Sequence, residues 1–172
     1  MEREGSLDDS GDASEDSWIQ WFCDLEGHEF FIEVDEEYIR DTFNLYGLRQ
    51  KITNYNEAMK MILSEEAPES EDFNDSKFLE IYEQAMDLYG LIHARYILSP
   101  RGLAIMKEKF LLNGFGTCPR VLCKRQSVLP IGISEELNTS RVKVFCPKCQ
   151  DVFVPRKGAI DIDGAYFGTS FP

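Results

Sequence analysis

The sequence contains no apolar run that approaches the roughly 20 residues needed for a membrane-spanning helix. Its first 17 residues carry seven acids and one base, Arg3, whereas a secretory signal begins basic and then turns apolar. We therefore expect an intracellular protein that makes no membrane contact. The thiols of such a protein stay reduced, so its five cysteines are expected to be metal ligands or buried thiols rather than disulfides.

Motifs for catalysis are also missing. There is no phosphate-binding glycine loop, no Gly-x-Ser-x-Gly turn and no protein-kinase signature set. Only two histidines are present, His28 and His93, and both are distant in sequence from most of the cysteines. We expect His93 to pack in a core or to lie on a helix surface. The chain is therefore predicted not to be an enzyme.

Basic residues are scarce, with 18 Lys and Arg against 31 Asp and Glu, for a net charge of -13. Residues 1–117 hold 26 acids and 10 bases, whereas residues 118–157 hold three acids and eight bases. The acidic bulk argues against general nucleic-acid binding, which needs a cationic face. It favours basic partners such as polyamines or basic proteins, although most single acids are expected only to keep the chain soluble.

Four cysteines form two short-range pairs, Cys118-x4-Cys123 and Cys146-x2-Cys149, separated by 22 residues. Two tight turns that each supply two sulfurs are typical of a four-thiolate zinc site. We predict one structural zinc ion per chain, held by these four residues. The fifth cysteine, Cys23, is expected to be a small buried apolar residue.

Apolar residues recur at helical spacing in the first two thirds of the chain. Helices are expected near residues 17–26, 35–41, 53–67, 76–99 and 100–111. The expected N-caps are Ser17 or Asp16 for the first, Ser76 for the fourth and Ser99 for the fifth, with Pro100 at its first position.

After Gly116 the pattern changes to short segments typical of strands, in residues 124–134, 140–146, 150–155 and 165–168. The predicted fold class is therefore α+β. We expect a disordered acidic tail (1–16), a mainly helical domain (17–114), and a small zinc-binding domain with a short antiparallel β-sheet (115–172).

Five segments resemble, in order, the regulatory (beta) subunit of casein kinase II: WIQWFCDLEGHEFFIEVDEEYIRDTFNLYGL, LYGLIHARYILSPRGLAIM, FGTCPRVLCKRQSVLPIG, VFCPKCQDVFVP and DGAYFGTSFP. The resemblance runs from Trp18 to Pro172. It implies a non-catalytic protein of the cytoplasm and nucleus that forms a homodimer through its zinc domain. Two catalytic subunits assemble on such a dimer to give a heterotetramer, and the regulatory subunit modulates their stability, activity and substrate choice.

Carried onto this chain, the resemblance implies that Cys118, Cys123, Cys146 and Cys149 are the zinc ligands. It also implies an apolar dimer contact made by Pro119, Val121, Ile133 and Val152. Size gives an independent reason, because a zinc module of about 40 residues cannot cover all of its own apolar side chains. The alternative is that these residues fill only the core of the module.

Residues 64–75, named here the acidic loop, match the acidic regulatory loop of the family, which the resemblance implies is a sensor for polyamines and basic proteins. The loop holds six acids and no base: Glu65, Glu66, Glu69, Glu71, Asp72 and Asp75. Such a cluster should attract cations with a strength that falls as salt rises. The alternative is a loop that is merely solvated.

Two further expectations come from the resemblance. Family members carry N-terminal serines that are followed by acids and phosphorylated by the holoenzyme, and Ser6 and Ser14 have this context here. In the family a further tail follows the position of Pro172 and supplies much of the contact with the catalytic subunit. A chain ending there is expected to dimerise but to bind the kinase weakly.

Two other functions compete. A stand-alone zinc ribbon that binds nucleic acid would use the seven bases Arg120, Lys124, Arg125, Lys143, Lys148, Arg156 and Lys157. Few aromatic residues nearby could stack on bases, and the long acidic segment that precedes them disfavours this alternative. A zinc hydrolase would need an open coordination position and usually a ligand other than thiolate.

Overall fold

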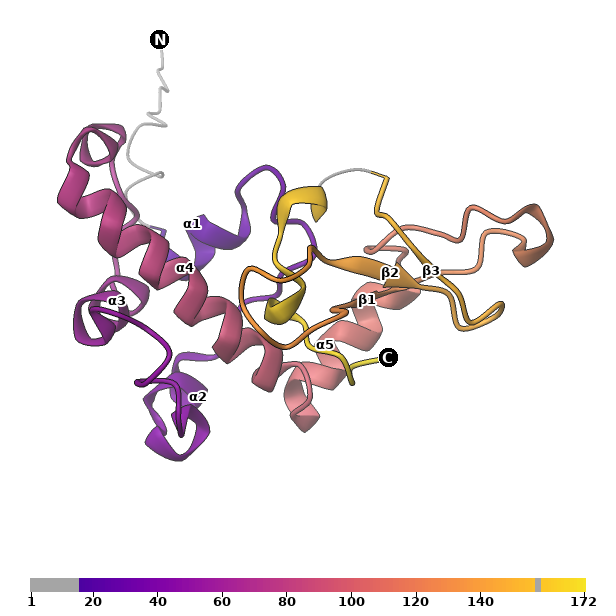
Figure 1. The fold of residues 1–172 in the computed structure, drawn as a ribbon, viewed down its shortest axis with the longest axis horizontal. Helices are drawn as coiled ribbons and strands as arrows, with labels where there is room; N and C mark the ends of the chain where they lie inside the picture. Colours follow the sequence, from indigo (N-terminus) through magenta and orange to yellow (C-terminus); the bar gives the residue numbers. More distant parts are fainter. Residues whose placement is uncertain (1–15, 157–158) are drawn as a thin grey trace, which may run out of the picture.

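The computed structural model describes residues 16–156 and 159–172. Figure 1 shows α1 to α4 gathered at one end of the molecule and the sheet at the other, with α5 leading from one to the other. The helices are α1 (Trp18–Cys23), α2 (Glu36–Arg40), α3 (Tyr55–Ile62), α4 (Ser76–Tyr96) and α5 (Pro100–Leu111). The strands are β1 (Leu129–Ile131), β2 (Lys143–Phe145) and β3 (Val152–Phe153). The predicted α+β class is confirmed.

Short 3-10 helices fill several of the connections. They are η2 (Thr42–Leu45), η3 (Ser70–Asn74), η4 (Val121–Cys123), η5 (Ala159–Asp161) and η6 (Gly164–Tyr166). Among the described residues, no helix is both long enough and apolar enough to cross a bilayer.

Side-chain caps fix where the main helices begin. The Ser17 hydroxyl accepts a hydrogen bond from the Gln20 N–H at 3.2 Å, and Ser99 caps α5 ahead of Pro100, both as predicted. The predicted cap of α4 is wrong by one residue. Asp75 is the N-cap, and its carboxylate accepts from the Lys77 N–H at 3.0 Å. Because the N-terminus of a helix favours a negative charge, the carboxylate of Asp75 is well suited to this position, and Ser76 becomes the first helical residue.

Helix α4 is the axis of the core. The apolar residues at helical spacing in this segment are half-buried at Phe78 and buried at Ile81, Ala85, Leu88, Ile92 and Tyr96. Towards its C-terminal end the helix is buried on nearly all sides, because α3 lies against one face and the C-terminal segment lies against another. Of the two positions expected for His93, a core or a helix surface, the structure has the first, since this side chain is fully buried.

The three strands form one antiparallel sheet in the order β1-β2-β3, in which Pro130 pairs with Val144 and Val144 pairs with Phe153. The prediction of a further strand in residues 165–168 is wrong. Ala165 and Tyr166 instead end η6 and Phe167 is its C-cap, while the Asp163 carboxylate caps the start of η6 through the Ala165 N–H.

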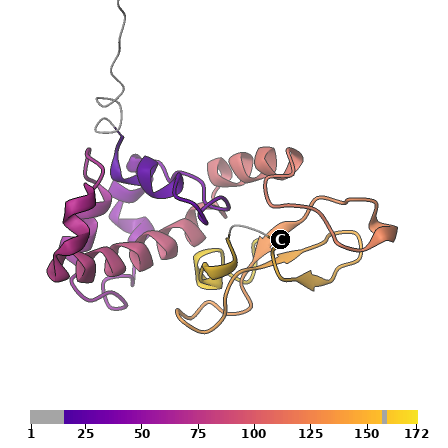
Figure 2. The ribbon, with the colours of Figure 1, turned by 90° about the horizontal axis from the view of Figure 1, so that it is seen from above.

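A long-range contact explains this difference. The ring of Tyr166 lies against Gly90 of α4, where a Cβ atom would overlap it. The Tyr166 hydroxyl donates to the Asp87 carboxylate at 2.6 Å, and the backbone carbonyl oxygen of Tyr166 accepts from His93 Nδ1 at 2.8 Å. Figure 2 shows this C-terminal segment between α4 and the sheet. Residues of the predicted zinc-binding domain therefore pack directly on a helix of the predicted helical domain.

Candidate metal centre

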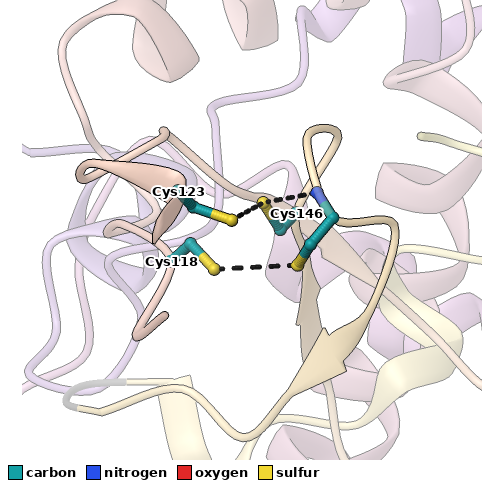
Figure 3. A group of neighbouring side chains, drawn as sticks. Cys118, Cys123 and Cys146 are labelled. Carbon is teal, nitrogen blue, oxygen red and sulfur yellow. Dashed lines mark hydrogen bonds between the residues drawn. The ribbon is translucent and has the colours of Figure 1, made fainter. Parts of the chain in front are cut away.

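The four cysteines of the predicted zinc site lie together, with all Sγ atoms within 4.8 Å of one another. The Cys118 and Cys149 sulfurs are 3.9 Å apart, and those of Cys123 and Cys146 are 4.0 Å apart. Figure 3 shows Cys118, Cys123 and Cys146 with their sulfurs facing a common centre. Four thiolates at about 2.3 Å from a zinc ion form a tetrahedron with edges of about 3.8 Å, so the cluster fits this ion.

Two tight turns bring the sulfurs together. In the first, the Cys118 N–H donates to the Gln126 carbonyl at 2.8 Å, and Lys124 and Arg125 after Cys123 have φ values of 51° and 60°. In the second, the Cys146 N–H donates to the Asp151 carbonyl at 3.0 Å, and Gln150 after Cys149 has a φ of 58°. Left-handed residues cost conformational energy. Both turns adopt them directly after their second cysteine, where the chain must reverse.

Backbone N–H groups point at the first sulfur of each turn. The Arg120 N–H lies 3.5 Å from Cys118 Sγ, and the Cys149 N–H lies 3.5 Å from Cys146 Sγ. Burial alone would raise the pKa of Cys146, but N–H groups of Cys149 and Lys148 and neighbouring thiols lower it to about 7. Withdrawal from water and hydrogen bonds to the other thiols raise the pKa of Cys123 to about 12. A divalent cation would offset the repulsion among four thiolates and keep all of them deprotonated.

The set of donors fits a structural zinc ion rather than a catalytic one. Three of the four cysteines are buried and Cys149 is half-buried. Both histidines are engaged elsewhere, because His28 Nδ1 donates to the Phe22 carbonyl and the two ring nitrogens of His93 bind Ile32 and Tyr166. Four thiolates complete a zinc coordination shell and leave no position for a substrate. The zinc-hydrolase alternative therefore has no support in this geometry.

The basic residues around the site are mostly exposed, but Arg120, two residues after Cys118, is paired with an acid. The Arg120 guanidinium lies 2.6 Å from the Asp151 carboxylate and stacks over the Phe153 ring, with 5.6 Å between the guanidinium carbon and the ring centroid. Arg120 thus covers Phe153, one of the few aromatic rings in this region that could stack on nucleic-acid bases. Lys157, another base of that alternative, lies outside the described residues.

The predicted dimer residues are exposed or partly exposed in the single chain, and Pro119 and Val121 lie between the first two cysteines of the metal centre. Val121 is 89% exposed, Ile133 is 56% exposed and Val152 is 38% exposed, and Pro119 is also exposed. Sequence reasoning missed two neighbours, Leu122 at 86% and Val154 at 64%. Leu122 directly follows Val121, and Val154 lies two residues after Val152. Their closeness in sequence to predicted contact residues is the signal that could have identified them.

The acidic loop is more ordered than a solvated segment would be. It contains η3, and its last residue, Asp75, caps α4. Five of its acids are exposed and Asp72 is half-buried: Glu65, Glu66, Glu69, Glu71 and Asp75 are the exposed ones. The two predicted phosphorylation sites, Ser6 and Ser14, lie outside the described residues.

Cys23 lies apart from the metal centre and is half-buried. Its thiol lies 3.6 Å from the Ile32 carbonyl and 3.4 Å from the Tyr89 hydroxyl. Burial raises its pKa to about 12, which makes it a poor nucleophile at neutral pH.

Comparison with known proteins gives the family. Residues 17–172 match the sequence profile of the casein kinase II regulatory subunit. Casein kinase II subunit beta-3 of Arabidopsis thaliana is 51% identical over 170 residues, which is 98% of this chain and 62% of the relative. Casein kinase II subunit beta of Dictyostelium discoideum is 49% identical over 169 residues, which is 96% of this chain and 61% of the relative. Casein kinase II subunit beta of Schizosaccharomyces pombe is 48% identical over 167 residues, which is 95% of this chain and 71% of the relative.

The chain thus spans about three fifths of the length of the Arabidopsis and Dictyostelium relatives. The family description names a regulatory subunit, so the prediction of a non-catalytic chain is confirmed at the level of the family. With its order of segments and its four-cysteine centre, the chain belongs to the casein kinase II regulatory subunit family.

Proposed function

We propose that this chain is a non-catalytic regulatory subunit of the protein kinase casein kinase II, acting as a zinc-stabilised homodimer that scaffolds two catalytic subunits. In that role it would modulate the stability, activity and substrate choice of the kinase. The observation that carries the proposal is the family match over residues 17–172, which includes the four-cysteine centre.

In this proposal one zinc ion per chain is held by Cys118, Cys123, Cys146 and Cys149. Its contribution is a cross-link between two turns that are otherwise joined by a three-stranded sheet with strands of only two or three residues. A sheet this small is marginal without further support. The metal therefore supplies much of the folding free energy of the module.

The zinc module forms the dimer contact in this proposal. The support is apolar surface: Pro119, Val121, Ile133 and Val152, joined by Leu122 and Val154, are not covered by the rest of the chain. Pro119 also lines an open apolar cavity of about 620 Å³ with Phe115, Phe153 and Val154. A group of exposed apolar side chains favours contact with another protein. A twofold contact with a second copy of the chain is the simplest closed arrangement.

The acidic loop would bind polyamines or basic proteins. Support comes from its exposed carboxylates and from the net charge of -13 of the whole chain. The proposal also includes phosphorylation of Ser6 and Ser14 and a location in the cytoplasm and nucleus. It further includes the boundary at residues 114–115 between the helical and the zinc-binding domain. These expectations rest on the sequence alone.

The test is co-purification with a casein kinase II catalytic subunit, with molar mass measured by light scattering at tens of micromolar. We expect the chain alone to have twice its own mass, and the mixture to contain a species with two copies of each subunit. A monomeric chain that leaves the catalytic subunit unbound at these concentrations would overturn the proposal. A parallel titration with DNA and RNA tests the zinc-ribbon alternative, which requires salt-sensitive submicromolar binding.

A further inference from the structure

Four aromatic residues join the acidic loop to the helical core. Phe73, in η3, has its ring centroid 6.0 Å from that of Trp21 in α1, 5.1 Å from that of Phe78 and 5.5 Å from that of Tyr82, both in α4. Trp21 also contacts Tyr82, with 5.9 Å between the centroids. All four side chains are half-buried. We name these residues the aromatic anchor.

The other end of the acidic loop is also attached to α1. The Trp18 N–H, at the start of this helix, donates to the Ser64 carbonyl at 3.1 Å. The Ser64 hydroxyl in turn accepts from the Glu66 N–H at 3.1 Å. The loop is therefore held against α1 at its first residue by a backbone bond and near its last residue by Phe73.

Hydrogen bonds between these two attachments fix the loop internally. The Asp72 carboxylate accepts from the Glu69 N–H at 2.8 Å, and the Asp72 N–H donates to the Glu69 carbonyl at 3.0 Å. Asp75 is occupied as the cap of α4. The nearby Lys77 ammonium lies 3.6 Å from the Glu80 carboxylate on its own helix. The exposed carboxylates of the loop are thus held on one short, ordered segment.

Like charges on a free segment spread apart, because spreading lowers their mutual repulsion. Here the anchor opposes that spreading, and burial of the Phe73 ring offsets part of the repulsion. A polycation that binds the ordered segment loses less entropy than one that must order it first. Anchoring therefore raises affinity without adding a charge.

We propose that Phe73 is a positioning residue for polycation binding: it holds the acidic loop as a preformed surface of carboxylates, and it transmits occupancy of that surface to Trp21. This inference rests on the proposed role of the loop as a polycation site. It adds which residue shapes the site and where in the fold binding is detected.

The main test is calorimetric titration of the chain with spermine at several salt concentrations. In Phe73→Ala we expect about five- to tenfold weaker binding, because the loop must then be ordered on binding. The dependence of affinity on salt should stay that of the unmodified chain, since no charge has changed. Phe73→Tyr should restore affinity to within about twofold, because it refills the anchor with an aromatic ring. Phe43→Ala is the matched control, because Phe43 lies on η2 and is 85% exposed.

Fluorescence tests the transmission to Trp21. The chain has two tryptophans, and Trp18 is only 1% exposed whereas Trp21 is half-buried in the anchor. Spermine should change the tryptophan emission of the unmodified chain. The change should be lost in Phe73→Ala at saturating spermine and in Trp21→Phe, and it should persist in Phe43→Ala.

The outcomes separate this inference from the proposed function. If replacing the six loop acids by their amides leaves spermine affinity unchanged, the loop is not the site and the proposed polycation role fails. If that variant loses binding while Phe73→Ala keeps both the affinity and the emission change, only the present inference is overturned. If Phe73→Ala does not fold, hydrogen exchange of the unmodified chain tests the inference instead. The Asp72 and Asp75 amides should be protected before spermine is added, and exchange at the rate of an unstructured peptide would overturn the inference.

Discussion

Cys23 and Cys146 carry the same thiol in different surroundings. The Cys23 sulfur is close to one carbonyl and one tyrosine hydroxyl, and burial raises its pKa to about 12. The Cys146 sulfur faces three other thiols, and although burial raises its pKa, the backbone N–H groups of Cys149 and Lys148 and the thiols of Cys118 and Cys149 lower it to about 7. The two residues therefore differ in what they can bind, and comparing their variants separates loss of a metal ligand from loss of a buried thiol.

Cys146→Ser should abolish metal binding, because a serine hydroxyl is a poor zinc ligand and the other three thiolates leave the shell incomplete. We expect less than about a tenth of an equivalent of zinc, unfolding of the C-terminal part and a monomeric or aggregated product. Cys23→Ser is the control and should retain about one equivalent. Elemental analysis and sedimentation measure these effects, and a zinc-loaded dimer of Cys146→Ser would contradict the assignment of the ligands.

His93 links three parts of the chain through its ring. Its Nε2 accepts from the Ile32 N–H at 3.2 Å and its Nδ1 donates to the Tyr166 carbonyl at 2.8 Å, so the ring is neutral when both bonds are made. Burial lowers its pKa from 6.5 to about 4. A protonated ring has no acceptor for the Ile32 N–H, so charging His93 opposes the fold.

This lowered pKa predicts how stability depends on pH. The unfolded chain takes up a proton at His93 below pH 6.5 and the folded chain does so only near pH 4, so acid favours unfolding across this window. The contribution is fully present above pH 6.5, and about 3 kcal/mol of it is lost as pH falls to about 4. Urea denaturation of the unmodified chain and His93→Gln from pH 7.5 to 4.5 would measure the difference, and parallel curves would contradict the prediction. His28 is retained in both proteins, so its titration cancels in the comparison.

Among the elements, local signals in the sequence were sufficient for the helices and the metal centre. The helix at Trp18 and the one at Pro100 begin where a serine can cap the first turn. The two cysteines of each pair lie close in space because a single turn of the chain joins them. Residues 165–168 were mispredicted as a strand because their conformation depends on α4, about 75 residues earlier in the chain. The aromatic anchor was missed for the same reason, because the contact of Phe73 with Trp21 joins distant segments. In the sequence around it, Phe73 is a single large apolar residue in an acidic segment.

The contact between α4 and η6 requires a glycine in the helix. Alanine at a helix interior is more favourable than glycine by about 1 kcal/mol, so Gly90→Ala would stabilise an isolated helix. In this fold the added Cβ overlaps the Tyr166 ring. We expect a net loss of about 1–3 kcal/mol in the free energy of unfolding, measured with urea.

A double-mutant cycle checks that the loss arises from this contact. In a Tyr166→Ala background the ring is absent, so Gly90→Ala should cost less than about 0.5 kcal/mol or become stabilising. An equal penalty in both backgrounds would show that the cost comes from elsewhere in the helix.

At the scale of the whole molecule, the acidic loop and the proposed dimer surface lie on different parts of the chain. The acidic loop precedes α4 at the helical end of the molecule (Figure 1), whereas Val121 and Leu122 lie in η4 beside Cys123 and Val154 follows β3, in the part of the chain that holds the sheet. The carboxylates of the acidic loop are therefore kept away from the surface that is proposed to bind a second copy. In the proposed dimer this separation would reduce the repulsion between two copies of a chain with a net charge of -13.

Val121→Glu tests that arrangement. In a symmetric contact the new carboxylate enters twice, and each copy must be desolvated against apolar side chains of the other. We expect the protein at about 10 µM to change from dimer to monomer in sedimentation velocity while it keeps its zinc, because Val121 lies between two ligands but its side chain faces solvent. Leu112→Glu is the matched control: this leucine is 78% exposed at the end of α5, outside the predicted contact, and its variant should remain dimeric. If Val121→Glu stayed a dimer, the apolar surface around the metal centre would not be the contact, and the exposed leucines of α5 would become the next surface to examine.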